Sequence, residues 1–160
     1  MAELRDVLED VGFDDVRTYL QSGNVVLSSP KKADEVARIC ERAIADRLGL
    51  DIDVVVRTSA DLARVVQRNP LGGVAANPKR YQVTFLATKP TRELIRELEA
   101  AAADHEQVVA SGREIYAWHP EGVARSKLWA LLASRRLGVT ATSRNWTTVT
   151  KLLELAEGAA

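Results

Sequence analysis

Hydrophobic positions in the first 70 residues of the chain follow two different periods. In some segments they recur every three or four residues, which places them on one face of a helix. In others they form short β-branched runs bounded by turn residues, which is typical of strands. The helical segments are residues 3–12, 32–48 and 59–68. The strand segments are residues 16–20, 24–28 and 52–56. The first half is therefore predicted to run helix, strand, strand, helix, strand, helix.

The second half repeats this order with one strand added at its start. The predicted strands are residues 81–87, 107–110, 114–118 and 139–141, and the predicted helices begin near residues 90, 122 and 143. Two pairs of matching residues support a duplication. The turn glycines Gly23 and Gly112 lie 89 residues apart, and Thr58 and Thr142 lie 84 residues apart. Two pairs in the same order at nearly the same offset indicate a repeated unit of about 85 residues.

The order strand-helix-strand-strand-helix-strand is that of a ferredoxin-like unit, with two helices on one face of a four-stranded antiparallel sheet. We therefore predict an α+β protein of two tandem ferredoxin-like units, residues 1–70 and 80–160, joined by a linker at 71–79. The second unit carries an additional C-terminal helix. The linker is indicated by the turn-forming Asn-Pro and Gly-Gly pairs between residues 69 and 78.

The first predicted unit lacks its initial strand, which is central in this arrangement. A missing central strand leaves backbone N–H and C=O groups without partners, which is costly when they are buried. We therefore predict that the chain as given is incomplete, with Met1 an internal methionine of a longer reading frame, or that a donated strand fills the place. A rearranged three-stranded sheet is the alternative.

Three segments carry a resemblance to a known family. They are RTYLQSGNVV at residues 17–26, PEGVARSKL at 120–128 and TSRNWTTVTKL at 142–152. The sequence resembles the bacterial family of unknown function DUF1697 over essentially the whole chain. The resemblance implies a tandem pair of ferredoxin-like units. The family usually opens with a strand and a glycine-rich turn before the first helix, and this sequence lacks that segment. The family has no established biochemical activity, so the resemblance implies a fold and not a function.

Composition narrows the class of protein. The 160 residues are 46% hydrophobic and 28% charged, which is ordinary for a globular protein. The formal net charge is zero, so no overall field draws the chain toward nucleic acid or membrane. Cys40 is the single cysteine, so no internal disulfide forms. No apolar run approaches the roughly 20 residues of a membrane span. We predict a cytoplasmic protein without a membrane partner.

Basic and aromatic residues are interleaved between residues 113 and 151. Basic side chains attract phosphate, and aromatic faces stack on bases. Tyr116 and Trp118 are two residues apart on a predicted strand, so they share one face of the sheet. This pattern predicts a site for an anion, a nucleotide or single-stranded nucleic acid. The alternative is that the aromatic residues form core and the basic residues form a solvated face.

Two pairs near helix starts are candidate ligand-binding residues. Arg125 and Lys127 follow Gly122 and predict a site for a small anion, with a simple turn-to-helix junction as the alternative. Arg144 and Asn145 are predicted in the first turn of the last helix, after Ser143 as its N-cap. A cation is unfavourable there because of the helix dipole, which suggests an anion or a carboxylate partner.

The first hairpin turn contains a further pair of candidates. Ser22 and Asn24 flank Gly23 and would present an amide side chain and backbone N–H groups to a ligand. A tight hairpin also requires such residues for its own geometry, and this is the alternative.

Residues suited to catalysis are few. His105 and His119 are the two histidines, and no spacing of His or Cys is typical of a metal site, so we expect no metal and no cofactor. His119, beside Trp118, is the one candidate for acid–base chemistry.

We therefore predict a non-catalytic binding module for a phosphate-bearing ligand, either a nucleotide or nucleic acid. One alternative is a small-molecule enzyme with its site between the repeats, using His119, Arg144 and Asn145. The other is a strand-exchanging assembly protein, a homodimer through the open sheet position.

Overall fold

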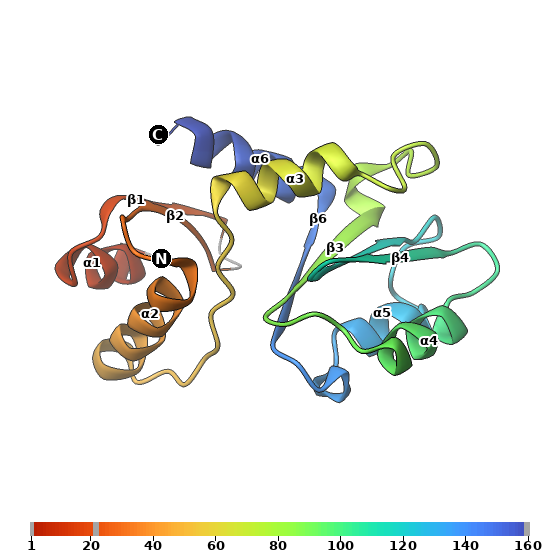
Figure 1. Ribbon diagram of the computed structural model, residues 1–160, viewed down its shortest axis with the longest axis horizontal. Coiled ribbons are helices and arrows are strands. Elements are labelled where there is room, and N and C mark those ends of the chain that lie inside the picture. The colour runs from red at the N-terminus through yellow and green to blue at the C-terminus, as the bar shows by residue number, and fades with distance from the viewer. Residues whose placement is uncertain (1, 21–22, 159–160) are drawn as a thin grey trace. The chain divides into compact units, whose positions relative to one another are not determined.

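The computed structural model describes residues 2–20 and 23–158 (Figure 1). Helices and antiparallel sheets are both present, so the predicted α+β class is confirmed. The chain divides into two compact units, Met1–Ala63 with Lys151–Ala160, and Arg64–Thr150. Within the described residues, no helix is both long enough and apolar enough to span a membrane.

The first unit consists of a hairpin packed with two helices. Its elements are α1 (Ala2–Asp10), β1 (Asp14–Tyr19), β2 (Asn24–Ser28), α2 (Ala33–Leu48) and the start of α3 (Ser59–Arg68). Strands β1 and β2 pair antiparallel, with Tyr19 opposite Asn24 at the turn. Helix α2 ends at Gly49, whose φ of 67° is the left-handed conformation that suits glycine at a helix end. The core of this unit is apolar and is formed by Leu8, Phe13, Val16, Val36 and Cys40.

The predicted strand at residues 52–56 is wrong. The segment pairs with no described strand, and the sheet of this unit contains β1 and β2 alone among the described residues. The three-stranded alternative is therefore not formed either. Val54 and Val56 still pack against the core, and the Val54 N–H donates to Glu41 Oε2 at 2.9 Å. The side chains have the pattern of a strand, but a strand requires a neighbour for its backbone hydrogen bonds.

The second unit has the strand and helix order of a ferredoxin-like fold. Its elements are β3 (Tyr81–Leu86), α4 (Arg92–Ala101), β4 (Gln107–Ser111), β5 (Glu114–Trp118), α5 (Lys127–Leu132), β6 (Ala141–Asn145) and the start of α6 (Trp146–Gly158), with short 3₁₀ turns η1 (Pro78–Arg80) and η2 (Arg135–Leu137). The sheet order is β4-β5-β3-β6, and all pairs are antiparallel. Strand β3 is central, as the repeat analysis predicts for the first strand of a complete unit.

The two faces of this sheet are covered differently. Helices α4 and α5 lie on one face (Figure 1), where Ile115 and Ala117 meet the leucines of the two helices. On the other face the ring of Tyr81 stacks on Trp146, with centroids 4.7 Å apart. The hydroxyl of Tyr116 on that face donates to the Val65 carbonyl of α3 at 3.4 Å. Both faces of β3 and β5 are consequently buried.

The division into units differs from the predicted boundary at residues 71–79. The predicted linker lies inside the second unit, where the Leu71 N–H donates to the Tyr81 hydroxyl and that hydroxyl donates to Asn69 Oδ1. The end of α6 belongs to the first unit, where Arg17 Nη2 donates to the Leu155 carbonyl at 2.8 Å. Proline and glycine mark turns in a sequence, but long-range contacts of this kind decide where a unit ends.

The caps of α3 and α6 come from the residue before each helix. Helix α3 is capped by Thr58, since Thr58 Oγ1 accepts the Asp61 N–H and the Asp61 carboxylate accepts the Thr58 N–H, both at 3.1 Å. Helix α6 is capped by Asn145, whose Oδ1 accepts the Thr148 N–H at 2.9 Å. Ser143, predicted as this cap, lies in β6.

Candidate functional site

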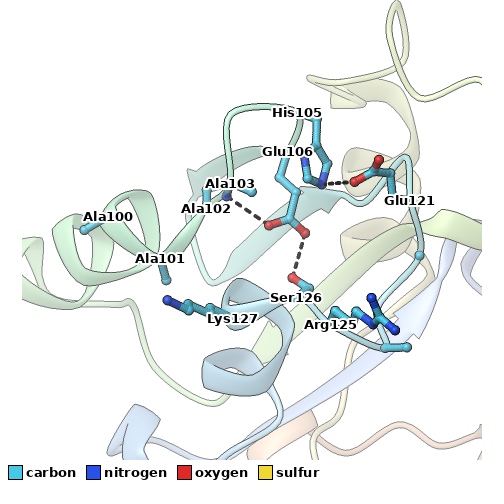
Figure 2. A pocket seen from close by; sticks show the side chains of 12 residues that line it. Ala100, Ala101, Ala102, Ala103, His105, Glu106, Glu121, Arg125, Ser126 and Lys127 are labelled. Atoms are coloured by element: carbon cyan, nitrogen blue, oxygen red, sulfur yellow. Dashed lines mark hydrogen bonds and ion pairs between the residues drawn. The ribbon is translucent and has the colours of Figure 1, made fainter.

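A pocket of about 700 Å³ opens in the second unit between the end of α4 and the loop that precedes α5 (Figure 2). One wall is the run Ala100–Ala103, and the other is formed by residues 121–127, apart from Val123. The volume lies within the usual range for small-molecule sites. The pocket is therefore a candidate site in this unit.

The local sequence explains why space remains here. Helix α4 is capped by Thr91, whose Oγ1 accepts the Leu94 N–H at 3.1 Å, and it ends in consecutive alanines with little side-chain volume. Opposite them, Gly122 has a φ of 85° and its N–H donates to the His119 carbonyl at 2.9 Å. A turn that needs positive φ favours glycine. Small residues on one wall and a tight turn on the other leave the cavity between them.

A hydrogen-bonded cluster lies at the base of the pocket. The Glu106 side chain is 2% exposed, and its Oε2 accepts hydrogen bonds from Ser126 Oγ and His119 Nδ1, each at 2.6 Å. Its Oε1 accepts the Ala103 N–H at 3.1 Å. Figure 2 shows the Glu106 carboxylate between Ala103 and Ser126. The carboxylate thus joins the end of α4, the end of β5 and the start of α5.

These contacts keep Glu106 ionised. Burial by itself raises the pKa of a carboxyl group, but the hydrogen bonds from Ser126, His119 and the Ala103 N–H outweigh burial and lower the pKa of Glu106 below its ordinary value. A buried carboxylate is stable only when it is hydrogen-bonded in this way. At neutral pH the Glu106 carboxylate at the base of the pocket is therefore charged, and groups of the protein already donate hydrogen bonds to it.

His119 belongs to this cluster but does not line the pocket. Its ring has no exposed surface and meets Trp129 edge-on, with centroids 5.9 Å apart. Its Nε2 atom is buried and has no hydrogen-bond partner among the described residues. The prediction that His119 performs acid–base chemistry gains no support from this position, because a reacting group must reach the ring.

Two of the predicted ligand-binding residues are brought to the pocket. Arg125 and Lys127 both line it, both are exposed, and neither forms an ion pair or a hydrogen bond through its side chain with another described residue. Figure 2 shows their side chains extending to opposite sides of Ser126, with Lys127 toward Ala101. The rim also carries an ion pair between His105 Nε2 and Glu121 Oε2 at 2.9 Å.

The predicted aromatic platform is not available to a ligand. Tyr116 is fully buried and Trp118 is 8% exposed, and both lie on the face of the sheet that carries Tyr81 of β3. A base needs an open ring face on which to stack. The expectation that these two residues stack on bases is therefore corrected, and the core alternative describes them. Sequence periodicity correctly placed them on one face but did not show what covers that face.

Arg144 and Asn145 lie in β6 and not in the first turn of a helix, so the argument from the helix dipole does not apply to them. Arg144 Nη1 donates to Thr142 Oγ1 at 2.6 Å and to the Ser143 carbonyl at 2.8 Å, and burial lowers the pKa of this guanidinium. Asn145 caps α6. Neither residue lines the pocket, so the structure does not bring them together with His119 there.

The hairpin-turn candidates belong to the first unit. Asn24 is buried, and its Nδ2 donates to the Tyr19 carbonyl at 3.1 Å, which closes the turn. Ser22 lies outside the described residues. The interactions of Asn24 fit the structural alternative, since the side chain serves the hairpin.

Sequence reasoning missed Glu106 and Ser126 as members of the site. Ser126 carried a usable signal, because a serine three residues before Trp129 at the start of an apolar run is typical of an N-cap, and its Oγ accepts the Trp129 N–H at 3.0 Å. Glu106 carried none, because two of its three partners, His119 and Ser126, lie 13 and 20 residues further along the chain. In the part of the chain that the structure describes, no group of three or more His, Cys, Asp or Glu residues is arranged to hold a metal ion.

Fold and site together define an α+β protein with a pocket of mixed polar and apolar lining in its ferredoxin-like unit. The chain belongs to the family described as "Protein of unknown function (DUF1697)", whose model matches residues 1–116, and the predicted family is thereby confirmed. The chain is also similar to the structure of a conserved bacterial protein from Streptococcus pneumoniae, with a TM-score of 0.71 and 19% identity, over 98% of this chain and 88% of that one. At this identity the likeness shows the fold alone. No curated protein matches the chain.

Proposed function

We propose that this protein is a non-catalytic binding protein for a small phosphate-bearing molecule, which occupies the pocket beside α5. The observation that carries the proposal is the pair Arg125 and Lys127, two cations without side-chain partners among the described residues, which line a cavity of about 700 Å³. Positively charged side chains in a concave site attract anions and raise their local concentration.

The two cations suit a phosphate group in different ways. The guanidinium of Arg125 offers a planar fork of N–H donors that matches two phosphate oxygens, and the ammonium of Lys127 acts as a point charge. Their side chains extend to opposite sides of Ser126 (Figure 2), so a bound molecule meets a cation toward either end of the pocket. The Glu106 carboxylate between them is already satisfied by three donors and does not need a cation from the ligand.

The remaining surface favours a small molecule over a nucleotide chain. The wall Ala100–Ala103 is apolar and its side chains are small, which suits a compact ligand. No open aromatic face is offered by Tyr116 or Trp118, whose burial removes the stacking that single-stranded nucleic acid requires. Among phosphate-bearing ligands we therefore favour a phosphorylated small molecule over nucleic acid.

The test is a titration of the ¹⁵N-labelled protein with inorganic phosphate at low and high salt. We expect amide shifts concentrated at residues 121–127 and binding that weakens as salt increases. Arg125→Ala and Lys127→Ala should each weaken binding by about tenfold, the value of one charged hydrogen bond. Arg96→Ala, which removes an exposed cation of α4 outside the pocket, is the matched control and should bind as the wild type does. The proposal is wrong if phosphate binding changes neither with salt nor in Arg125→Ala and Lys127→Ala.

A second candidate function, assembly through an open sheet position, is favoured by one observation in the first unit. Strand β2 pairs with β1 alone among the described residues, and the extended residues 52–56 pack on the same core without pairing. From α1 to α3 the order of elements parallels that from α4 to α6, except that the unpaired residues 52–56 stand where the second unit has β6, and no described strand corresponds to β3. An unpaired edge is a template for a strand from another chain.

Light scattering over a range of protein concentrations tests this candidate. We expect a homodimer whose β2 amides exchange more slowly with solvent than those of the dilute monomer. A monomer at every concentration contradicts it.

A further inference from the structure

We infer that Glu106 is a positioning residue for the proposed anion pocket, and that its bond to Ser126 sets the directions of Arg125 and Lys127. The inference rests on the proposed function, because it assigns a role within that site. It concerns a residue whose carboxylate bonds to Ser126, His119 and Ala103 and acts on the two cations through Ser126.

The first step is the connection between Ser126 and the two cations. Ser126 is the residue between Arg125 and Lys127, so a change in its backbone moves both side chains. Its hydroxyl is used twice, since it donates to Glu106 Oε2 at 2.6 Å and accepts the Trp129 N–H at 3.0 Å. The segment that carries the cations is therefore attached to a buried carboxylate on one side and to α5 on the other.

The second step is that Glu106 itself has little freedom. Its side chain is 2% exposed, its Oε1 is held by the Ala103 N–H, and His119 donates to the same oxygen that Ser126 uses. The backbone N–H of His119 in turn donates to the Arg80 carbonyl at 3.0 Å, which holds His119 in place. Hydrogen bonds to a charged acceptor in a buried setting are among the stronger ones in proteins. Glu106 thus fixes the cation-bearing loop against the alanine wall of the pocket.

The third step separates positioning from simple electrostatics. A carboxylate near a bound anion repels it, so Coulomb's law alone predicts that removing the charge of Glu106 tightens anion binding. Positioning predicts the opposite, because Arg125 and Lys127 lose their common anchor. The sign of the change in affinity therefore distinguishes the two roles.

The experiment measures inorganic phosphate binding by NMR titration for wild type, Glu106→Gln and Ser126→Ala, with Glu97→Gln as control. Glu97 is an exposed carboxylate of α4 that does not line the pocket, so its replacement removes an equal charge without touching the anchor. We expect about tenfold weaker binding in Glu106→Gln and in Ser126→Ala, as for the loss of one charged hydrogen bond, and wild-type affinity in the control.

A spectroscopic readout accompanies the affinities. Without phosphate, the amide signals of residues 125–127 should shift in both variants, while signals of β3 and β5 stay in place and show that the unit is folded. If Glu106→Gln does not fold, Ser126→Ala decides alone, because it breaks the same link and leaves the buried charge. Unchanged or tighter phosphate binding in a folded variant overturns the positioning role. Failure of the wild type to bind phosphate overturns instead the proposed function on which this role depends.

Discussion

The two hairpins of the molecule share a Ser-Gly pair in their sequences but differ in what surrounds them. In the first unit β2 pairs with β1 alone among the described residues, and Val25 and Leu27 are only half-buried. In the second unit β5 pairs with β4 and with β3, and Ile115, Tyr116 and Ala117 have no exposed surface. The same local motif thus forms an isolated ribbon in one setting and the inside of a sheet in the other.

The difference shows that the neighbouring elements decide how much a strand contributes to stability. A strand with partners on both sides uses its backbone groups on both edges and buries both faces under other elements. Residues 52–56 show the effect of a missing neighbour. Their apolar residues pack on a core, but no described strand pairs with them, so they form no strand.

Truncating one core side chain in each hairpin is the strongest test. Ile115→Ala removes a fully buried side chain and should lower the free energy of unfolding by about 3 kcal/mol, through lost burial and an unfilled cavity. Leu27→Ala removes a half-buried side chain and should lower the free energy of unfolding by about 1 kcal/mol, because folding buries less of that side chain's surface. Urea unfolding of both variants gives the two values, and equal losses would contradict the comparison.

The two units can be followed separately in that experiment. All three tryptophans lie within Arg64–Thr150, so tryptophan fluorescence reports on the second unit. Cys40, the single cysteine, lies in the core of the first unit and reports on that one.

Cys40 labelling gives the second prediction. Burial, and secondarily the charge of Glu41, raises the pKa of the Cys40 thiol from 9.0 to about 11. Two units of pKa correspond to about 100-fold less thiolate at pH 8, and the thiolate is the reactive form. We expect slow reaction with a thiol reagent in water and rapid reaction once urea opens the first unit. If the folded protein reacts as fast as a free thiol, the first unit has no stable core at this position.

Acid should affect the second unit before the first. Glu106 has a pKa below its ordinary value of 4.5, so the stability it contributes is present above that value and is lost as the pH falls through the lower folded pKa. The core of the first unit contains no buried carboxylate among the described residues, so its response to acid should be smaller. Tryptophan fluorescence at pH 3 and pH 7 follows the second unit, and the NMR amide signals of α2 at the same two pH values follow the first.

Glu106→Gln provides the control for this prediction. The variant should be less stable than the wild type at pH 7 and should lose less stability on acidification. An equal loss in variant and wild type would assign the acid response to other groups.

Most of the helices and strands could be predicted from the sequence. The spacing of apolar residues located α2, α4 and the hairpins to within a few residues, because local periodicity alone determines which face of an element is apolar. The exceptions are residues whose conformation depends on distant partners. Residues 52–56 have the composition of a strand without a neighbour, and Ser143 has the composition of a cap but lies in a strand paired with β3.

The candidate site was predictable only in part. Arg125 and Lys127 were identified from charge beside a turn glycine, and the pocket contains both. Glu106 was not, because its meaning depends on Ser126 and His119, which are 20 and 13 residues away. Tyr116 and Trp118 were assigned to the correct face of a strand, yet whether that face was open or covered depended on α3 and Trp146.

By itself the sequence determined most of the order of helices and strands, the family, and the two cations beside the turn at Gly122. These follow from short-range patterns, in which neighbours along the chain meet whatever the rest of the molecule does. Only the tertiary structure decided which strand edges are paired, which aromatic rings are covered, and that a buried carboxylate lies beneath the cations. Those features depend on groups far apart in the chain, whose hydrogen bonds and burial arise when the units fold.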